Sequence, residues 1–147
     1  MKTYLVVAGY IFSKNKVLLV HHSKLDLWLP PGGHIDKDET PDDALLREIK
    51  EELSMDVEVL NQSDISAQGN VIKNLALPFH VNVHSINDHN HCCFFYICKA
   101  LNPENLKANH EIKNFEWFTR EQLNQNHVPI DVRHMALKAF ELIDKLE

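Results

Sequence analysis

Three glutamates crowd one short stretch of the chain, at positions 48, 51 and 52. Successive residues of an α-helix turn by about 100°, so residues three or four apart share a face. In a helix, Glu48, Glu51 and Glu52 therefore project into one narrow arc. Carboxylates this close repel one another unless a cation neutralises them. Clustered carboxylates suit a hard divalent cation such as Mg²⁺, which commonly binds phosphate oxygens as well. The spacing predicts metal-dependent chemistry on phosphates.

The residues before these glutamates are typical of a sharp loop followed by a helix start. The run Pro30-Pro31-Gly32-Gly33 joins a rigid pair to a permissive pair, which favours a specified turn. Thr40 suits a helix N-cap and Pro41 the first helical position, and two acids follow them. We expect a helix from here to about Leu53. Its apolar arc, beside the carboxylates, consists of Leu45, Leu46, Ile49 and Leu53.

Composition limits the possible classes of protein. The 147 residues, 44% apolar and 24% charged, predict one domain over residues 1–147 with a core of its own. A net charge of -6 argues against a nucleic-acid polymer or an anionic membrane as partner, and no run approaches a membrane span. A small anionic substrate stays open, since bound metal reverses the charge locally. Three cysteines in one apolar run, without zinc spacing, favour reduced thiols and a cytoplasmic location.

The rest of the chain alternates strands with helices. Period-two patterns and β-rich composition predict strands at 3–12, 16–22, 57–60, 79–86, 92–100 and 115–118. A second amphipathic helix is expected over 130–146. Residues 79–86 place apolar side chains on one face and His80, Asn82 and His84 on the other. The chain is predicted to be an α/β protein.

The stretch 33–55 resembles the Nudix box, G-x5-E-x7-R-E-U-x-E-E-x-G-U, where U is a bulky aliphatic residue. Matches occur at Gly33, Glu39, Arg47, Glu48, Ile49, Glu51 and Glu52, and Met55 fills the last aliphatic position. Ser54 replaces the late glycine. That glycine usually ends the helix with left-handed backbone angles, so the replacement concerns the turn rather than the chemistry. The resemblance implies a Nudix fold, a mixed central β-sheet sandwiched between α-helices.

The same resemblance implies roles for the matching residues. The Gly32 carbonyl and the Glu51 and Glu52 carboxylates are expected to bind the metal, and Glu48 to bind it through water or to act as the base. The glycine pair, Gly32 with Gly33, lets the backbone come close to the ligands. Arg47 is expected to form an ion pair with Glu39 that ties the loop to the helix.

Further candidates lie outside the box. Glu111 precedes Trp117, and similar enzymes often carry an extra catalytic or metal-binding glutamate on that loop; Glu116 is the weaker rival because it falls within a strand. His80 and His84 either contact substrate phosphates or line the polar face of their strand. Four other histidines have no spacing that requires a metal and are predicted to be solvated: His21, His22, His89 and His91.

The predicted reaction is Mg²⁺-dependent hydrolysis of a diphosphate bond, with Mn²⁺ as a possible substitute. Glu48 or Glu111 activates water, which attacks phosphorus in a nucleoside diphosphate linked to another group X, or in a (d)NTP. The alternative is a non-catalytic nucleotide-binding or regulatory module, which is expected to lack box carboxylates that this chain retains. The substrate itself is not specified. Many similar proteins pair as homodimers, so a homodimer is a further expectation.

Overall fold

Strand β1 (Thr3–Ser13) forms the centre of the structure, a computed structural model that describes residues 1–125 and 127–147. Its side chains alternate between two hydrophobic clusters, as expected for a strand covered on both faces. Val6 and Tyr10 belong to the cluster that contains the second helix, whereas Val7 and Ile11 belong to the cluster that contains the first helix. A strand with two apolar faces thus joins both halves of the core.

The sheet is mixed, as predicted. β1 runs parallel to β7 (His89–Ala100) and antiparallel to β2 (Lys16–His22) and β4 (Gly32–His34). The main strand order is β3-β2-β1-β7-β5, and β6 pairs with β7 and β8 with β2. The remaining strands are β3 (Leu27–Leu29), β5 (Val57–Val59), β6 (His80–Ile86) and β8 (Ile112–Phe118).

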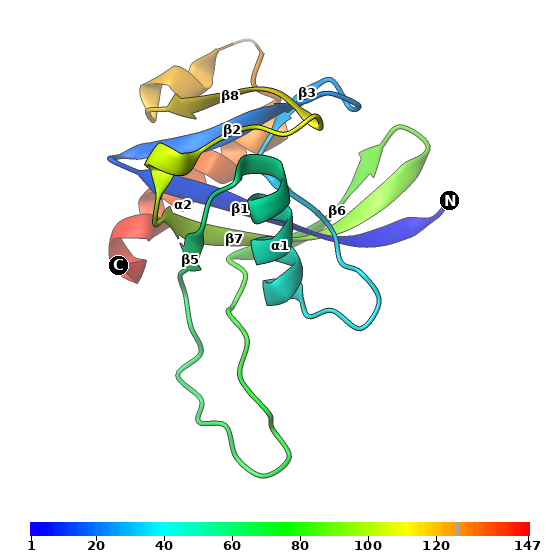
Figure 1. The fold of residues 1–147 in the computed structure, drawn as a ribbon, viewed down its shortest axis with the longest axis vertical. Helices are drawn as coiled ribbons and strands as arrows, with labels where there is room; N and C mark the ends of the chain where they lie inside the picture. The colour runs from blue at the N-terminus through cyan, green and yellow to red at the C-terminus, as the bar shows by residue number, and fades with distance from the viewer. Residues whose placement is uncertain (126) are drawn as a thin grey trace.

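Two helices cover opposite faces of this sheet, which confirms the predicted α/β sandwich. α1 (Pro41–Leu53) lies in front of the sheet and α2 (Ile130–Leu146) behind it (Figure 1). Short 3₁₀ turns occupy Pro103–Asn105 and Glu121–Asn124. Within the described residues, neither helix has the length and apolar character needed to cross a membrane.

Helix α1 begins and ends as its sequence predicts. The Thr40 side chain accepts a hydrogen bond from the Asp43 backbone N–H at 3.1 Å, and Pro41 occupies the first turn. At the other end Ser54 adopts left-handed angles, φ 55° and ψ 33°, and its N–H donates to the Lys50 carbonyl. Serine therefore retains the backbone shape that the replaced glycine would adopt without strain.

Two strands share one edge of β1, and this arrangement positions the glycine turn. β2 pairs with the end of β1, whereas β4 pairs with residues 6–8. Between them the Gly9 N–H donates to the Pro31 carbonyl at 2.9 Å. A Cβ on Gly32 would overlap the Val7 carbonyl, and one on Gly33 would overlap the Glu48 carboxyl group. Only glycines allow this turn to lie between β1 and α1.

Two strands are longer than predicted. β7 begins at His89 rather than residue 92, because the polar residues His89 to His91 pair with β6 in a hairpin. β8 begins at Ile112 rather than residue 115, because it pairs with β2 as far as His22. The predicted helix over 130–146 agrees with α2.

The left-handed angles of Ser54 carry a free-energy cost that glycine would avoid. We expect Ser54→Gly to raise the free energy of unfolding by roughly 0.5–1 kcal/mol. A non-glycine residue with left-handed backbone angles costs about 1–2 kcal/mol, and glycine removes this cost. Glycine also loses more chain entropy on folding, which reduces the net stabilisation. Chemical denaturation measures the change. The matched control is Ser85→Gly in the extended strand β6, where we expect lower stability. Equal effects at both positions would contradict the explanation.

Candidate active site

Arg47 joins the glycine loop to helix α1 through a bidentate ion pair. Its Nε donates to Glu39 Oε2 at 2.8 Å and its Nη2 to Glu39 Oε1 at 3.0 Å, as predicted. The same guanidinium also donates to the His34 carbonyl at 3.0 Å and to Glu48 Oε1 at 2.9 Å. Five donors in a rigid fork suit this task, which lysine could not perform in the same way. Arg47 therefore fixes the loop and orients Glu48.

This network holds two carboxylates in different electrostatic states. The Arg47 hydrogen bonds, with the Asp36 backbone N–H, lower the pKa of Glu39 to about 2. Glu48 is half-buried, and burial raises its pKa although Arg47 opposes the effect. Glu39 is therefore a permanent anion paired with Arg47, whereas Glu48 has a higher proton affinity than an ordinary surface carboxylate.

Glu52 is a buried carboxylate whose negative charge is not fully compensated by its neighbours. Its side chain is 2% exposed, and Oε1 has no hydrogen-bond partner among the described residues. Burial, followed by the charges of Glu48 and Glu111, raises the pKa of Glu52 to about 8. An ionised carboxylate is expensive to bury unless a cation or hydrogen bonds compensate it. The site therefore has a place for a cation.

The loop before β8 is fastened to the end of α1, which brings Glu111 opposite Glu52. The last carbonyls of a helix lack partners within it. Here the Glu52 carbonyl accepts the Asn109 N–H at 2.9 Å, and the Leu53 carbonyl accepts the Lys107 N–H at 2.9 Å. The Glu111 N–H donates to Asn109 Oδ1 at 2.9 Å, and the Glu111 carbonyl accepts the Ser23 N–H at 2.8 Å. These bonds join β2, α1 and the loop at one point.

Three donor groups converge there. Single donor atoms of His22, Glu52 and Glu111 lie within 4.8 Å of one another. The two carboxylates fit Mg²⁺ or Mn²⁺, which bind oxygen ligands and keep coordinated waters for exchange with phosphate. The Leu25 N–H donates to His22 Nδ1 at 3.2 Å, so the neutral ring carries its proton on Nε2. His22 is thereby set to donate a hydrogen bond rather than to bind the metal.

A cavity of about 880 Å³ contains this centre. Glu48, Glu52, Glu111 and His22 line it together with the glycine turn. Its volume is within the range of sites for nucleotide-sized ligands. Glu48 and Glu52, on the predicted edge of helix α1, therefore face a space that can hold a substrate, and Glu111 faces it from the loop before β8.

The predicted site residues do not all reach this cavity. Glu51 is 55% exposed and accepts a hydrogen bond from Arg47 Nη1 at 3.3 Å; it is not among the cavity-lining residues, and its role as metal ligand stays a prediction. His84 lines the cavity, whereas His80 is exposed outside the lining and packs against Phe95. Glu116 lies in β8, as predicted.

From the sequence, His22, His89 and His91 are predicted to be solvated and to have no role in the site. The structure places all three in the cavity lining, with His34. His89 and His91 are two residues apart on β7 and so share a face, but His22 comes from β2 and His34 from β4, so the group meets only in the folded chain.

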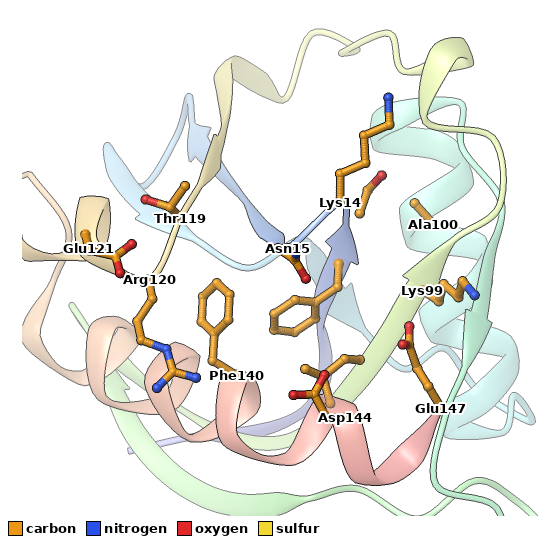
Figure 2. A pocket seen from close by; sticks show the side chains of 13 residues that line it. Lys14, Asn15, Lys99, Ala100, Thr119, Arg120, Glu121, Phe140, Asp144 and Glu147 are labelled. Carbon is orange, nitrogen blue, oxygen red and sulfur yellow. The ribbon is translucent and has the colours of Figure 1, made fainter.

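A second cavity of about 660 Å³ lies at the ends of β1, β7 and α2. Figure 2 shows Arg120, Phe140 and Asp144 around it, with Lys14 and Lys99 nearby. The Arg120 guanidinium carbon is 5.4 Å from the centre of the Phe140 ring. The lining contains both charge signs and none of the box residues.

The raised pKa of Glu52 predicts a pH-dependent stability. Because the folded protein holds this proton more tightly than the unfolded chain, the stabilising contribution is complete below about pH 4.5 and is lost as the pH rises through about 8. Without divalent metal, the wild type should lose stability against Glu52→Gln over this window, with a slope of at most about 1.4 kcal/mol per pH unit. Urea denaturation at several pH values measures it.

The control for this prediction is Glu58→Gln, an exposed carboxylate of β5. We expect it to follow the wild type at every pH. A constant difference in stability between wild type and Glu52→Gln would show that Glu52 has an ordinary pKa.

Comparison with known proteins agrees with this geometry. The model of the NUDIX domain matches residues 2–137. A hydrolase of the NUDIX family from Clostridium perfringens has a similar structure, with a TM-score of 0.83, 30% sequence identity, and coverage of 97% of this chain and 99% of that chain.

Two similar sequences have named activities. The 8-oxo-dGTP diphosphatase of Proteus vulgaris is 32% identical over 79 residues, which are 50% of this chain and 70% of that protein. The mRNA-decapping enzyme subunit 2 of Saccharomyces cerevisiae is 41% identical over 58 residues; these are 38% of this chain and only 6% of the yeast protein. With the domain match over nearly the whole length, the arrangement of glycine turn, Arg47 and carboxylates identifies the chain as a member of the Nudix family.

Proposed function

We propose that this protein is a pyrophosphohydrolase that cleaves a diphosphate bond in a small nucleotide, either a nucleoside diphosphate linked to another group or a (d)NTP. The observation that carries the proposal is the buried Glu52 carboxylate, which has an unpartnered oxygen and faces Glu111 inside a nucleotide-sized cavity. A purely structural carboxylate at this depth would be paired.

Glu52 and Glu111 would hold Mg²⁺, with Mn²⁺ as substitute, and the Gly32 carbonyl and Glu51 are the further ligands that we propose. When bound, such an ion neutralises diphosphate oxygens and the negative charge that develops on the leaving phosphate. Glu51 would become available to such an ion on giving up its weak 3.3 Å contact with Arg47, and the Arg47–Glu39 pair would remain intact.

Glu48 is the base that we propose, in preference to Glu111. Its raised pKa favours proton acceptance, Arg47 holds its carboxylate in place, and Gly33, which has no Cβ, leaves room for it. Glu111 instead shares the donor cluster with Glu52. Glu48 takes a proton from water, the water oxygen bonds to phosphorus, and the bridging P–O bond breaks so that the second phosphate leaves with the bridging oxygen. The His22 Nε2–H can donate to a phosphate oxygen.

The Proteus vulgaris diphosphatase supports a nucleotide substrate. The cavity adds support, since its lining combines charged residues with the apolar side chains of Leu29, Phe95, Val132 and Met135. Apolar walls of this kind suit a base or another planar group. Cytoplasmic location and a homodimer stay predictions from the sequence.

The experiment is a screen for released phosphate or pyrophosphate over nucleoside diphosphate derivatives and nucleoside triphosphates, with Mg²⁺ and with EDTA. We expect turnover of at least one substrate that EDTA abolishes. Glu48→Gln should lower kcat by about 10²–10⁴-fold with little change in metal affinity. Loss of a residue that only hydrogen-bonds a metal ligand typically weakens metal binding by roughly 10–100-fold. Because Glu52 and Glu111 are proposed as ligands themselves, Glu52→Gln and Glu111→Gln should weaken Mg²⁺ binding by more than this. Isothermal titration measures that affinity.

Glu58→Gln serves as the matched control and should retain wild-type turnover, because Glu58 is exposed on β5. Tight nucleotide binding without turnover of any substrate, under Mg²⁺ or Mn²⁺, would favour the non-catalytic module instead. Unchanged kcat in Glu48→Gln together with loss in Glu111→Gln at saturating metal would assign the base to Glu111.

A further inference from the structure

The hairpin of β6 and β7 carries histidines whose rings are held by their neighbours. His89 Nδ1 lies 3.0 Å from Asp88 Oδ1, and His84 Nδ1 lies 3.0 Å from Asn82 Oδ1. Each oxygen accepts the Nδ1 proton, so the neutral rings leave the Nε2 lone pair free. An oxygen acceptor on the opposite nitrogen is the arrangement found behind metal-binding histidines.

The Nε2 atoms of His89 and His91 face each other, and the His91 Nε2–H donates a hydrogen bond to the free Nε2 of His89. Their Nε2 atoms are 3.1 Å apart. Two nitrogens at about 2.0–2.1 Å from one tetrahedral zinc ion lie roughly 3.3–3.4 Å apart, so the pair needs almost no adjustment to share an ion. Tyr4 packs edge-on against the His89 ring, with centroids 5.3 Å apart, and this contact restrains the ring. The two nitrogens thus have nearly the spacing of two ligands of one zinc ion.

We propose that His89 and His91, completed by His84, bind a borderline transition-metal ion such as Zn²⁺ at a site separate from the carboxylate centre. The rings of His84 and His91 have centroids 5.5 Å apart, so rotation of the His84 side chain, with adjustment of its hydrogen bond to Asn82, would bring its Nε2 to the ion. On binding, the His91 proton moves from Nε2 to Nδ1, and the ion replaces the hydrogen bond between the two rings.

The donor types separate the two sites. Imidazole nitrogens favour Zn²⁺, Cu²⁺ and Ni²⁺, whereas carboxylates with water favour Mg²⁺ and Mn²⁺. His89 and His91 come from the start of β7, their ring neighbours are His34, His84 and Tyr4, and neither belongs to the group of His22, Glu52 and Glu111. Both groups line the same cavity. An ion on the histidines would thus add positive charge to the space that an anionic ligand enters.

The test uses the full chain carrying Glu52→Gln and Glu111→Gln, which removes the carboxylate donors. Zn²⁺ is titrated into EDTA-treated, dialysed protein by competition with a chromophoric chelator, and ¹⁵N spectra of the imidazoles identify the ligands. We expect one bound Zn²⁺ and shifts of the Nε2 signals of His84, His89 and His91. Adding His91→Gln should weaken binding at least about tenfold. Adding His134→Gln, an exposed histidine of α2, should leave the affinity unchanged.

Wild-type protein saturated with Mg²⁺ gives an independent reading if the double variant does not fold. Zn²⁺ should then shift the same three histidines. Loss of Zn²⁺ binding on removal of the two carboxylates, or shifts confined to His22, would place the ion at the carboxylate centre and overturn the proposal. Because these readouts do not depend on turnover, a protein without hydrolase activity leaves the proposal intact.

Discussion

The structure depends on one unfavourable interaction, the burial of the Glu52 carboxylate between two other acids. Glu48 and Glu111 both raise its pKa, burial raises it further, and one oxygen has no partner among the described residues. Among the described residues, Arg47 donates to Glu39, Glu48 and Glu51 and does not pair with Glu52. With a pKa of about 8, Glu52 holds a proton at neutral pH. In the function that we propose, a cation from solution would replace that proton, and metal binding would then contribute to the stability of the site.

Two sets of hydrogen bonds keep the acids in place despite their repulsion. At one side Arg47 joins the glycine loop to α1 and fixes Glu48. At the other side the free carbonyls at the end of α1 accept N–H groups of the loop that carries Glu111. Three residues of the predicted apolar arc, Leu45, Ile49 and Leu53, hold the helix against the sheet, whereas the fourth, Leu46, is 43% exposed. Packing energy from the core thus offsets the electrostatic cost at the cavity.

Much of this arrangement could be predicted from sequence, because it is local. The Thr40 cap, the Arg47–Glu39 pair and the left-handed Ser54 depend on residues close together in the chain. The cavity lining could not be predicted, since strand pairing decides it. Residues 79–86 alternate as expected, yet Val83 is 61% exposed while His84 lines the cavity, the reverse of the usual apolar-inside rule. Likewise His22 meets Glu52 only because β2, α1 and the loop before β8 converge.

Proton release on Mg²⁺ binding is the most direct measure of whether the buried Glu52 carboxyl group keeps its proton until a cation binds. Titration calorimetry of Mg²⁺ at pH 7, in buffers of different ionisation enthalpy, counts the protons that leave the protein for each ion bound. Since the pKa of Glu52 is about 8, we expect release of close to one proton per ion by the wild type and none by Glu52→Gln. Mg²⁺ binding by the wild type without proton release would contradict it.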